Sequence, residues 1–139
     1  MARRSDQRRA AAFALYQKAV TDRTLDEVLG RDASPFTRSL AHAGDDYGED
    51  LDALIGKHAK GWSLDRIAPL ERAIMRIALL EMLHPDVAPG DRPIPPEGAI
   101  DEAVETAKRF CGSEAPGFVN GILNAVLREM REAEAQPRR

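Results

Sequence analysis

The sequence predicts an all-α protein, a compact bundle of about seven helices. Hydrophobic residues make up 43% of the chain but aromatic residues only 5%, and the abundant alanine and leucine are strong helix formers. Apolar residues recur at spacings of three, four and seven, which is the period of an amphipathic helix. Residues 69–83, PLERAIMRIALLEML, are apolar on several sides, which indicates a central helix covered by others.

Length and composition limit the domain count and the location. With 139 residues the chain can bury one hydrophobic core, so we expect a single domain over 1–139 with flexible ends at about 1–4 and 134–139. The one cysteine excludes an intrachain disulfide, and the first residues lack the apolar segment of a signal peptide. The central apolar stretch is too short to span a bilayer. We therefore expect a cytoplasmic protein without a membrane partner.

The first two helices are predicted from their caps. A helix begins at Ser5 or Asp6 and continues to about residue 20, and its alanine-rich middle indicates close packing against another helix. Thr24 or Asp22 then caps a short helix over 25–30, which a glycine ends.

One long amphipathic helix is predicted from Ser34 to about Ala59. Ser34 and Pro35 are a cap followed by a first-turn proline. Apolar residues then recur with helical spacing at Phe36, Leu40, Tyr47, Leu51, Leu54 and Ile55. Gly44 and Gly48 each weaken a helix by about 1 kcal/mol relative to alanine. Either they permit close contact between helices or they mark a bend, and both interpretations stay open.

A turn with a brief helix, capped by Ser63, precedes the central helix. Trp62 is expected to pack at that junction, because tryptophan is usually largely buried. After the central helix, residues 84–98 contain five prolines, which prevent regular structure. This stretch is the one clear linker.

Two amphipathic helices complete the chain. The first runs from Pro96 or Glu97 to Gly112 and buries an apolar stripe made of Ile100, Ala103, Val104, Ala107 and Phe110. The second begins between Ser113 and Pro116 and buries Val119, Ile122, Leu123, Val126 and Met130. Its polar end is expected to fray.

No catalytic residue, metal site or cofactor is predicted. The three histidines are scattered, without the spacing of a metal site, and no paired cysteines, glycine-rich phosphate loop or nucleophile elbow is present. Cys111 has no evident activating base and is expected to be a half-buried small residue. The sequence therefore indicates a binding module and not an enzyme.

Two features favour nucleic acid as a ligand. The first is a basic cluster at the start of the chain, Arg3, Arg4, Arg8 and Arg9, whose guanidinium groups can line one side of a helix start and bind phosphates. A solubilising end is the alternative. The second is Asn120, which can present a donor and an acceptor to a base edge, followed by Gly121, which permits close approach. Taken alone, helix packing explains that glycine better.

Four segments together resemble the NusB family of bacterial transcription antitermination factors: ALYQ at 14–17, WSLDRIAPLERAIMRIALLEML at 62–83, AIDEAVETAKRF at 99–110 and FVNGIL at 118–123. The resemblance covers nearly the whole chain and implies two small helical subdomains. It further implies binding to boxA RNA of nascent ribosomal RNA transcripts together with the ribosomal protein NusE. The complex, with RNA polymerase and other Nus factors, promotes read-through of terminators.

The resemblance also suggests roles for individual residues. Tyr16 and Phe118 lie in matched segments and would stack on RNA bases, although both rings could belong to the core instead. Glu71 and Glu81 would contact the protein partner, because a carboxylate on an apolar helix needs a cation or solvent. An internal salt bridge from Glu81 to Arg76 is the alternative.

The chain departs from the family pattern at three places. Asp101 stands where asparagine is common, Gly117 stands where a basic residue often precedes FVNG, and the loop before residue 96 is longer and richer in proline. A second hypothesis therefore remains: a helical accessory or protein–protein adaptor domain, related to those fused to ribosomal RNA methyltransferases, without boxA binding. A homodimer is also compatible with the sequence.

Overall fold

Seven α-helices and one short 3₁₀ helix, η1, form the described part of the chain, which comprises residues 3–88, 90 and 93–136 of a computed structural model. The all-α class is confirmed. In chain order the elements are α1 (Arg4–Val20), α2 (Leu25–Leu29), α3 (Pro35–Asp46), α4 (Gly48–His58), η1 (Leu64–Arg66), α5 (Pro69–Leu83), α6 (Pro96–Phe110) and α7 (Ala115–Ala135).

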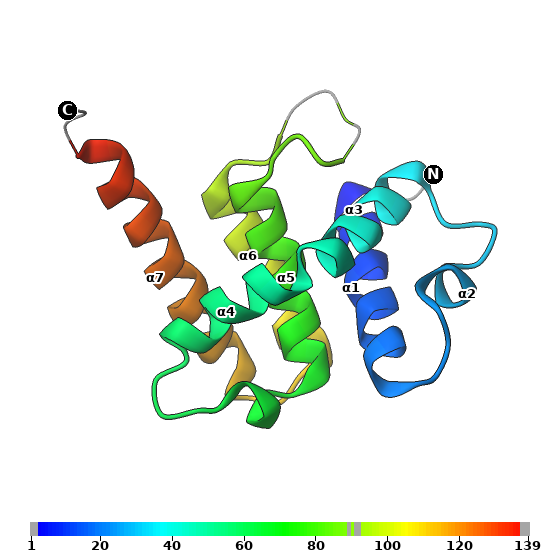
Figure 1. The fold of residues 1–139 in the computed structure, drawn as a ribbon, viewed down its shortest axis with the longest axis horizontal. Helices are drawn as coiled ribbons and strands as arrows, with labels where there is room; N and C mark the ends of the chain where they lie inside the picture. Colours follow the sequence, from blue (N-terminus) through cyan, green and yellow to red (C-terminus); the bar gives the residue numbers. More distant parts are fainter. Residues whose placement is uncertain (1–2, 89, 91–92, 137–139) are drawn as a thin grey trace.

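Helix α5 is the centre of the fold, as the sequence predicts. It packs against α1, α3, α4, α6 and α7, and Figure 1 shows it in green with α1, α2 and α3 on one side and α6 and α7 on the other. Nine of its residues are buried, Ala73, Ile74, Met75, Ile77, Ala78, Leu79, Leu80, Glu81 and Met82. Glu81 is the one charged residue in this set. The position of α5 explains why its apolar residues point in several directions.

The N-terminal helices follow their predicted caps, with one correction. Helix α1 begins at Arg4, one residue before the predicted start at Ser5 or Asp6, and Arg3 occupies its N-cap position. Residues 1–2 lie outside the described part. Thr24 caps α2 through a reciprocal pair of hydrogen bonds with Glu27. Ser34 caps α3 by accepting a hydrogen bond from the backbone N–H of Thr37, at 3.1 Å.

The predicted long helix from 34 to 59 is wrong, because the chain bends at Tyr47 and forms two helices. Hydrogen bonds continue on both sides of the bend, since Tyr47 N–H donates to Ala43 and Tyr47 C=O accepts from Leu51. Both interpretations of the glycines apply. A Cβ on Gly44 would lie 2.9 Å from the Leu15 side chain of α1, and Gly48 begins α4 against the guanidinium of Arg76.

The C-terminal half agrees with the predictions made from the sequence, except for some helix boundaries and the predicted cap at Ser63. Ser63 stands at the N-cap position of η1 but makes no capping hydrogen bond through its side chain. Helix α6 ends at Phe110 and not at Gly112. Helix α7 extends to Ala135, and fraying of its end stays a prediction. Residues 89, 91–92 and 137–139 of the linker and tail lie outside the described part.

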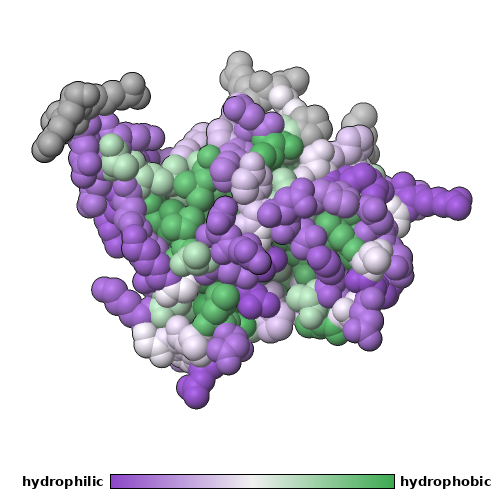
Figure 2. Space-filling view, in the orientation of Figure 1, coloured by the Kyte–Doolittle hydropathy of each residue, from purple (hydrophilic) through white to green (hydrophobic). Residues whose placement is uncertain are grey.

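The outer faces of the helices are polar. In the view of Figure 2, hydrophilic residues follow the outside of α7 and the α3 side of the molecule, with hydrophobic residues in smaller areas between them. Among the helices in the described residues, none has the length and apolarity needed to cross a membrane.

Candidate nucleic-acid interface

The N-terminal arginines do not line one side of α1. Arg4 is exposed, donates a hydrogen bond to Gln7 at 3.0 Å and lies over the ring of Phe36, 4.1 Å from its centroid. Arg8 faces the same ring at 5.3 Å. Arg9 points the other way, over Phe110 of α6 at 5.5 Å. The predicted single row of guanidinium groups is therefore wrong, although Arg3 and Arg4 remain accessible cations.

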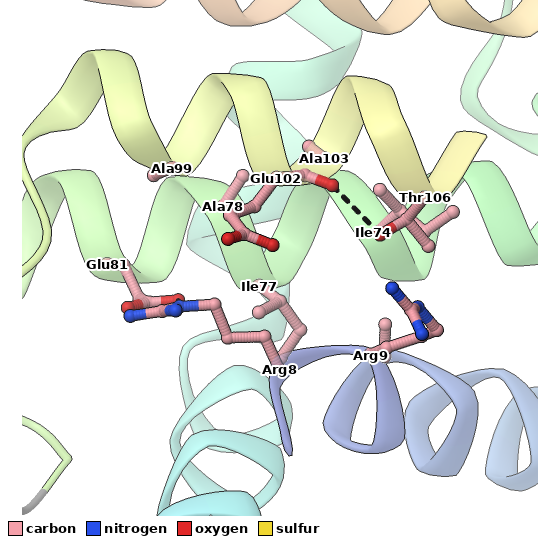
Figure 3. A pocket seen from close by; sticks show the side chains of 11 residues that line it. Arg8, Arg9, Ile74, Ile77, Ala78, Glu81, Ala99, Glu102, Ala103 and Thr106 are labelled. Carbon is pink, nitrogen blue, oxygen red and sulfur yellow. Dashed lines mark hydrogen bonds and ion pairs between the residues drawn. The ribbon is translucent and has the colours of Figure 1, made fainter. Parts of the chain in front are cut away.

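Arg8 is engaged inside the protein. Its Nε donates to Glu81 Oε1 at 2.8 Å, and only 14% of the Arg8 side chain and 9% of the Glu81 side chain are exposed. Figure 3 shows Arg8 reaching from α1 to Glu81 of α5. The predicted alternative for Glu81, a salt bridge to Arg76, is wrong, because Arg76 pairs with Asp52 of α4 at 2.5 Å.

An arginine–phenylalanine patch, made of Arg9, Phe13, Arg109 and Phe110, lies where α1 meets the end of α6. The rings of Phe13 and Phe110 meet edge to face at a centroid distance of 5.0 Å. The guanidinium carbons of Arg9 and Arg109 each lie 5.5 Å from the Phe110 centroid. Phe110 is 44% exposed, so its predicted place in a buried stripe is wrong. An exposed ring beside guanidinium groups is the chemistry that binds single-stranded nucleic acid.

A second site, the Trp62 pocket, lies between η1 and α7. This cavity of about 190 Å³ is lined by Trp62, Arg66, Ile67, Ala68, Glu71, Glu114, Ala115 and Phe118. Trp62 is 53% exposed and so is not buried in its junction as expected, but its ring contacts Phe118 at a centroid distance of 6.2 Å. The pocket combines two aromatic rings and two carboxylates with one guanidinium group, that of Arg66, so its acidic groups are in excess, which suits a cationic side chain.

Electrostatics connect the two sites. Burial raises the pKa of Glu71 above its ordinary value, and a hydrogen bond from the Ala68 backbone partly opposes this shift. Cys111 directly follows Phe110 and is half-buried, as predicted. Burial and then the charge of Glu71 raise the pKa of its thiol. The Cys111 thiol, which follows Phe110 at the end of α6, is therefore within electrostatic reach of Glu71 in the Trp62 pocket.

The remaining predicted residues are partly accessible. Tyr16 and Phe118 are half-buried and pack against the core, and each keeps an exposed part. Asn120 is exposed, and its side-chain oxygen accepts from Asn124 at 2.9 Å. A Cβ on Gly121 would meet no atom within 4 Å, so helix packing does not explain this glycine.

Sequence reasoning missed Phe13, Phe110 and Arg109. A usable signal was present, because Arg109 and Phe110 adjoin at the end of an amphipathic helix, where the last residue of an apolar stripe projects beyond the core. The contact of Phe13 with Phe110 could not be predicted, because the two residues are 97 positions apart in the chain. Within the described ranges, no group of three or more histidine, cysteine, aspartate or glutamate residues could hold a metal ion.

Comparison with known proteins gives one consistent result. The model of the NusB family matches residues 5–128. Among curated relatives, the transcription antitermination protein NusB of Bacillus subtilis (strain 168) is 34% identical, and the match covers 94% of this chain and 99% of the relative. That of Halalkalibacterium halodurans is 36% identical, over 84% of this chain and 87% of the relative.

Solved structures agree with the sequence relatives. The structure described as "T. maritima NusB, P3121, Form 2" is 30% identical with a TM-score of 0.78, and the match covers 92% of both chains. A chain from "Crystal Structure of Antitermination Factors NusB and NusE in complex with dsRNA" has a TM-score of 0.73, with 91% of this chain and 96% of that chain covered. At 24% identity, the second match supports the fold alone.

Proposed function

This chain belongs to the NusB family, and from that premise we propose that it is a transcription antitermination factor. It binds boxA RNA of nascent ribosomal RNA transcripts together with the ribosomal protein NusE, and the complex helps RNA polymerase and other Nus factors to read through terminators. The observation that carries this proposal is the family match over residues 5–128, which includes every residue of the arginine–phenylalanine patch and of the Trp62 pocket.

The arginine–phenylalanine patch is proposed as the RNA site. Phe110 offers an exposed ring on which a base can stack, and its neighbour Arg109 is exposed and can pair with a phosphate. Arg3, at the N-cap of α1, and Arg4, its first residue, are further accessible cations, and Arg4 lies over Phe36 and not over Phe110. Asn120 supplies a side-chain amide for a base edge. The net charge of −3 makes this a local basic site on an acidic protein, so affinity for RNA alone is expected to be weak.

The Trp62 pocket is proposed as part of the NusE site. Glu71 is partly desolvated, and an isolated carboxylate in such surroundings is stabilised by a cation from a partner. The exposed Trp62 ring and the half-buried Phe118 ring provide apolar contact area, as aromatic residues do at interfaces. Phe118 belongs to this pocket and also to the segment predicted to bind RNA, so RNA and partner meet near it.

The protein is proposed to act by binding alone, in the cytoplasm, without a catalytic residue or a cofactor. Its relatives are transcription proteins, and both sites present ring faces, guanidinium groups and carboxylates on separate helices. An assay for boxA-dependent read-through by RNA polymerase therefore tests activity directly.

Binding of a short boxA RNA, measured with and without NusE, separates this proposal from the alternative of an adaptor without RNA binding. A scrambled RNA of equal length is the control. The proposed function predicts that the ternary mixture binds boxA RNA more tightly than the scrambled strand. If NusE binds while boxA and scrambled RNA are held equally weakly, the adaptor hypothesis takes its place.

A further inference from the structure

A polar seam runs through the contact of α1 with α5 and α6, and Arg9 of the arginine–phenylalanine patch lines the small cavity in it. Arg8 of α1 pairs with Glu81 of α5, and Ser5 of α1 donates to Glu102 Oε1 of α6 at 2.7 Å. In Figure 3 the charged ends of Arg8 and Glu81 lie together between α1 and α5, and Glu102 of α6 lies above them. In the described part of the chain, Arg8–Glu81 is the one ion pair that joins α1 to α5.

The surroundings of this pair are mixed. A small cavity of about 20 Å³ beside it is lined by apolar residues of α5 and α6 and also by the polar residues Arg9, Glu102 and Thr106. Burial raises the pKa of Glu81, a shift opposed by the hydrogen bond and charge of Arg8 and increased by the charge of Glu102. Breaking such a pair is costly because it leaves a desolvated charge without a partner. The pair therefore strongly favours one placement of α1 on α5.

The placement of α1 decides the geometry of the RNA site. Arg9 follows Arg8 directly, and Phe13 lies about one and a half turns further along the same helix. Both reach Phe110 through side-chain contacts, at 5.5 Å and 5.0 Å. A rotation or shift of the N-terminal half of α1 would separate these rings and remove Arg9 from the face of Phe110. We infer that Glu81 is a positioning residue for RNA binding, which holds Arg8 as an internal anchor of α1 and contacts neither RNA nor NusE.

This inference rests on the proposed function, and its first test uses boxA RNA with NusE present. The variants are Arg8→Ala, Arg8→Lys, Glu81→Gln and the double variant Arg8→Ala/Glu81→Gln. Asp101→Asn, which removes an exposed carboxylate of α6 that has no partner among the described residues, is the matched control. Circular dichroism melts set a temperature at which every variant is folded, so the affinities report the folded state and not its stability.

Arg8→Ala and Glu81→Gln are each expected to weaken boxA binding on the order of 5 to 10-fold, a coupling typical of residues in one network. The double variant is expected to lose no more boxA affinity than the single variant that binds boxA less tightly, because both changes remove the same anchor. Arg8→Lys is expected to retain most of the affinity, since one donor suffices for the single Nε–Oε1 contact. The control is expected to bind like the wild type.

The salt dependence separates an anchor from a phosphate contact. Each phosphate contact on a single strand contributes roughly 0.7 to the slope of log affinity against log salt concentration. Arg8→Ala is expected to leave this slope unchanged. A slope reduced by about 0.7 would make Arg8 an RNA contact, and a folded Glu81→Gln variant with wild-type RNA affinity would remove its positioning role. If Glu81→Gln weakened only the binding of NusE, Glu81 would belong to the NusE interface.

A second readout needs no RNA. Amide hydrogen exchange in residues 7–11, whose N–H groups are the first to donate within α1, is expected to be faster in Glu81→Gln than in Asp101→Asn, because the first turns of α1 lose their anchor. Equal exchange in the two variants would overturn the inference by itself. If the wild type binds no boxA RNA with NusE but exchange responds as expected, the proposed function fails while the anchoring of α1 stands.

Discussion

At the scale of single residues, the RNA site depends on side chains whose chemical types are ordinary and whose neighbours come from far along the chain. Arg109 and Phe110 are adjacent in sequence, yet the ring becomes a platform only because Phe13 of α1 supports its edge. Arg109 supplies the positive charge and Phe110 supplies the stacking surface, so substitution of each residue can separate the two contributions to RNA binding.

Arg109→Ala and Phe110→Ala are expected to weaken boxA binding in different ways. Loss of the Arg109 charge should reduce the salt slope by roughly 0.7. Loss of the Phe110 ring should cost about 1 to 3 kcal/mol of binding free energy at every salt concentration and leave the slope unchanged. Fluorescence anisotropy across a salt series measures both quantities. Arg31→Ala, at an exposed arginine near α2, serves as the control, and equal slopes for Arg109→Ala and Arg31→Ala would exclude Arg109 from the site.

Glu71→Lys is expected to weaken NusE binding and to leave the fold intact. Glu71 lies in the first turn of α5 and is only half-buried, so a lysine can reach solvent, whereas the reversed charge repels a cationic side chain in the Trp62 pocket. Calorimetry with NusE measures the loss, and a thermal melt checks the fold. A variant that kept NusE affinity but lost RNA binding would reverse the assignment of the two sites.

The sequence predicts those site residues that lie in recognisable local segments, but not the contacts between residues that are far apart in the chain. Glu71, Phe118 and Asn120 could be proposed because each lies in a segment that resembles the family. Glu81 could be recognised as a carboxylate that needs a cation, since it interrupts an apolar helix. Its partner could not be identified, because Arg8 is 73 positions away and nothing local distinguishes it from Arg76, which lies on the same helix as Glu81.

At the scale of elements, caps were more predictable than bends. Thr24 and Ser34 cap their helices through local hydrogen bonds that sequence spacing specifies. The bend at Tyr47 could not be located, because apolar residues keep a helical period across it. Only the packing of Gly44 on Leu15 and of Gly48 on Arg76 shows why two glycines stand there.

Gly44→Ala and Gly56→Ala are expected to change stability in opposite directions. A methyl group on Gly44 would lie 2.9 Å from Leu15 and 3.4 Å from Ile77, two buried core residues, so overpacking should cost about 1 to 3 kcal/mol. A methyl group on Gly56 meets nothing within 4 Å, so the gain in helix propensity should add roughly 0.5 to 1 kcal/mol. Urea unfolding measures both changes, and equal midpoints would contradict the close contact at Gly44.

The connection between α4 and α7 is expected to weaken in acid. Lys57 donates to Glu129 at 2.6 Å, and His58 also contacts that carboxylate. These hydrogen bonds lower the pKa of Glu129 below its ordinary value of 4.5. The stabilisation is therefore fully present above about pH 4.5 and is lost as the pH falls through the lowered pKa.

Glu129→Gln tests this dependence. The melting temperature of the variant should be lower than that of the wild type at neutral pH, and the difference should shrink as the pH falls below 4.5. A difference between the two proteins that stayed constant down to acid pH would show that the charge of Glu129 plays no part in the connection.

At the scale of the whole molecule, the two sites are adjacent and each is incomplete. The RNA site holds few accessible cations on a chain of net charge −3, and the Trp62 pocket holds carboxylates that favour a basic partner. A basic protein bound at Glu71 would bring additional positive charge toward the C-terminal end of α6, because Glu71 acts electrostatically on Cys111, the residue after Phe110. RNA and NusE should therefore bind cooperatively.

The most direct test is a calorimetric titration of NusE into this protein, performed once alone and once with saturating boxA RNA. Linkage requires that RNA tighten NusE by the same factor by which NusE tightens RNA, which for typical couplings is on the order of 5 to 150-fold. We expect an increase in NusE affinity within that range, and a scrambled RNA should produce little of it. Equal NusE affinities with and without boxA RNA would contradict cooperative binding at adjacent sites.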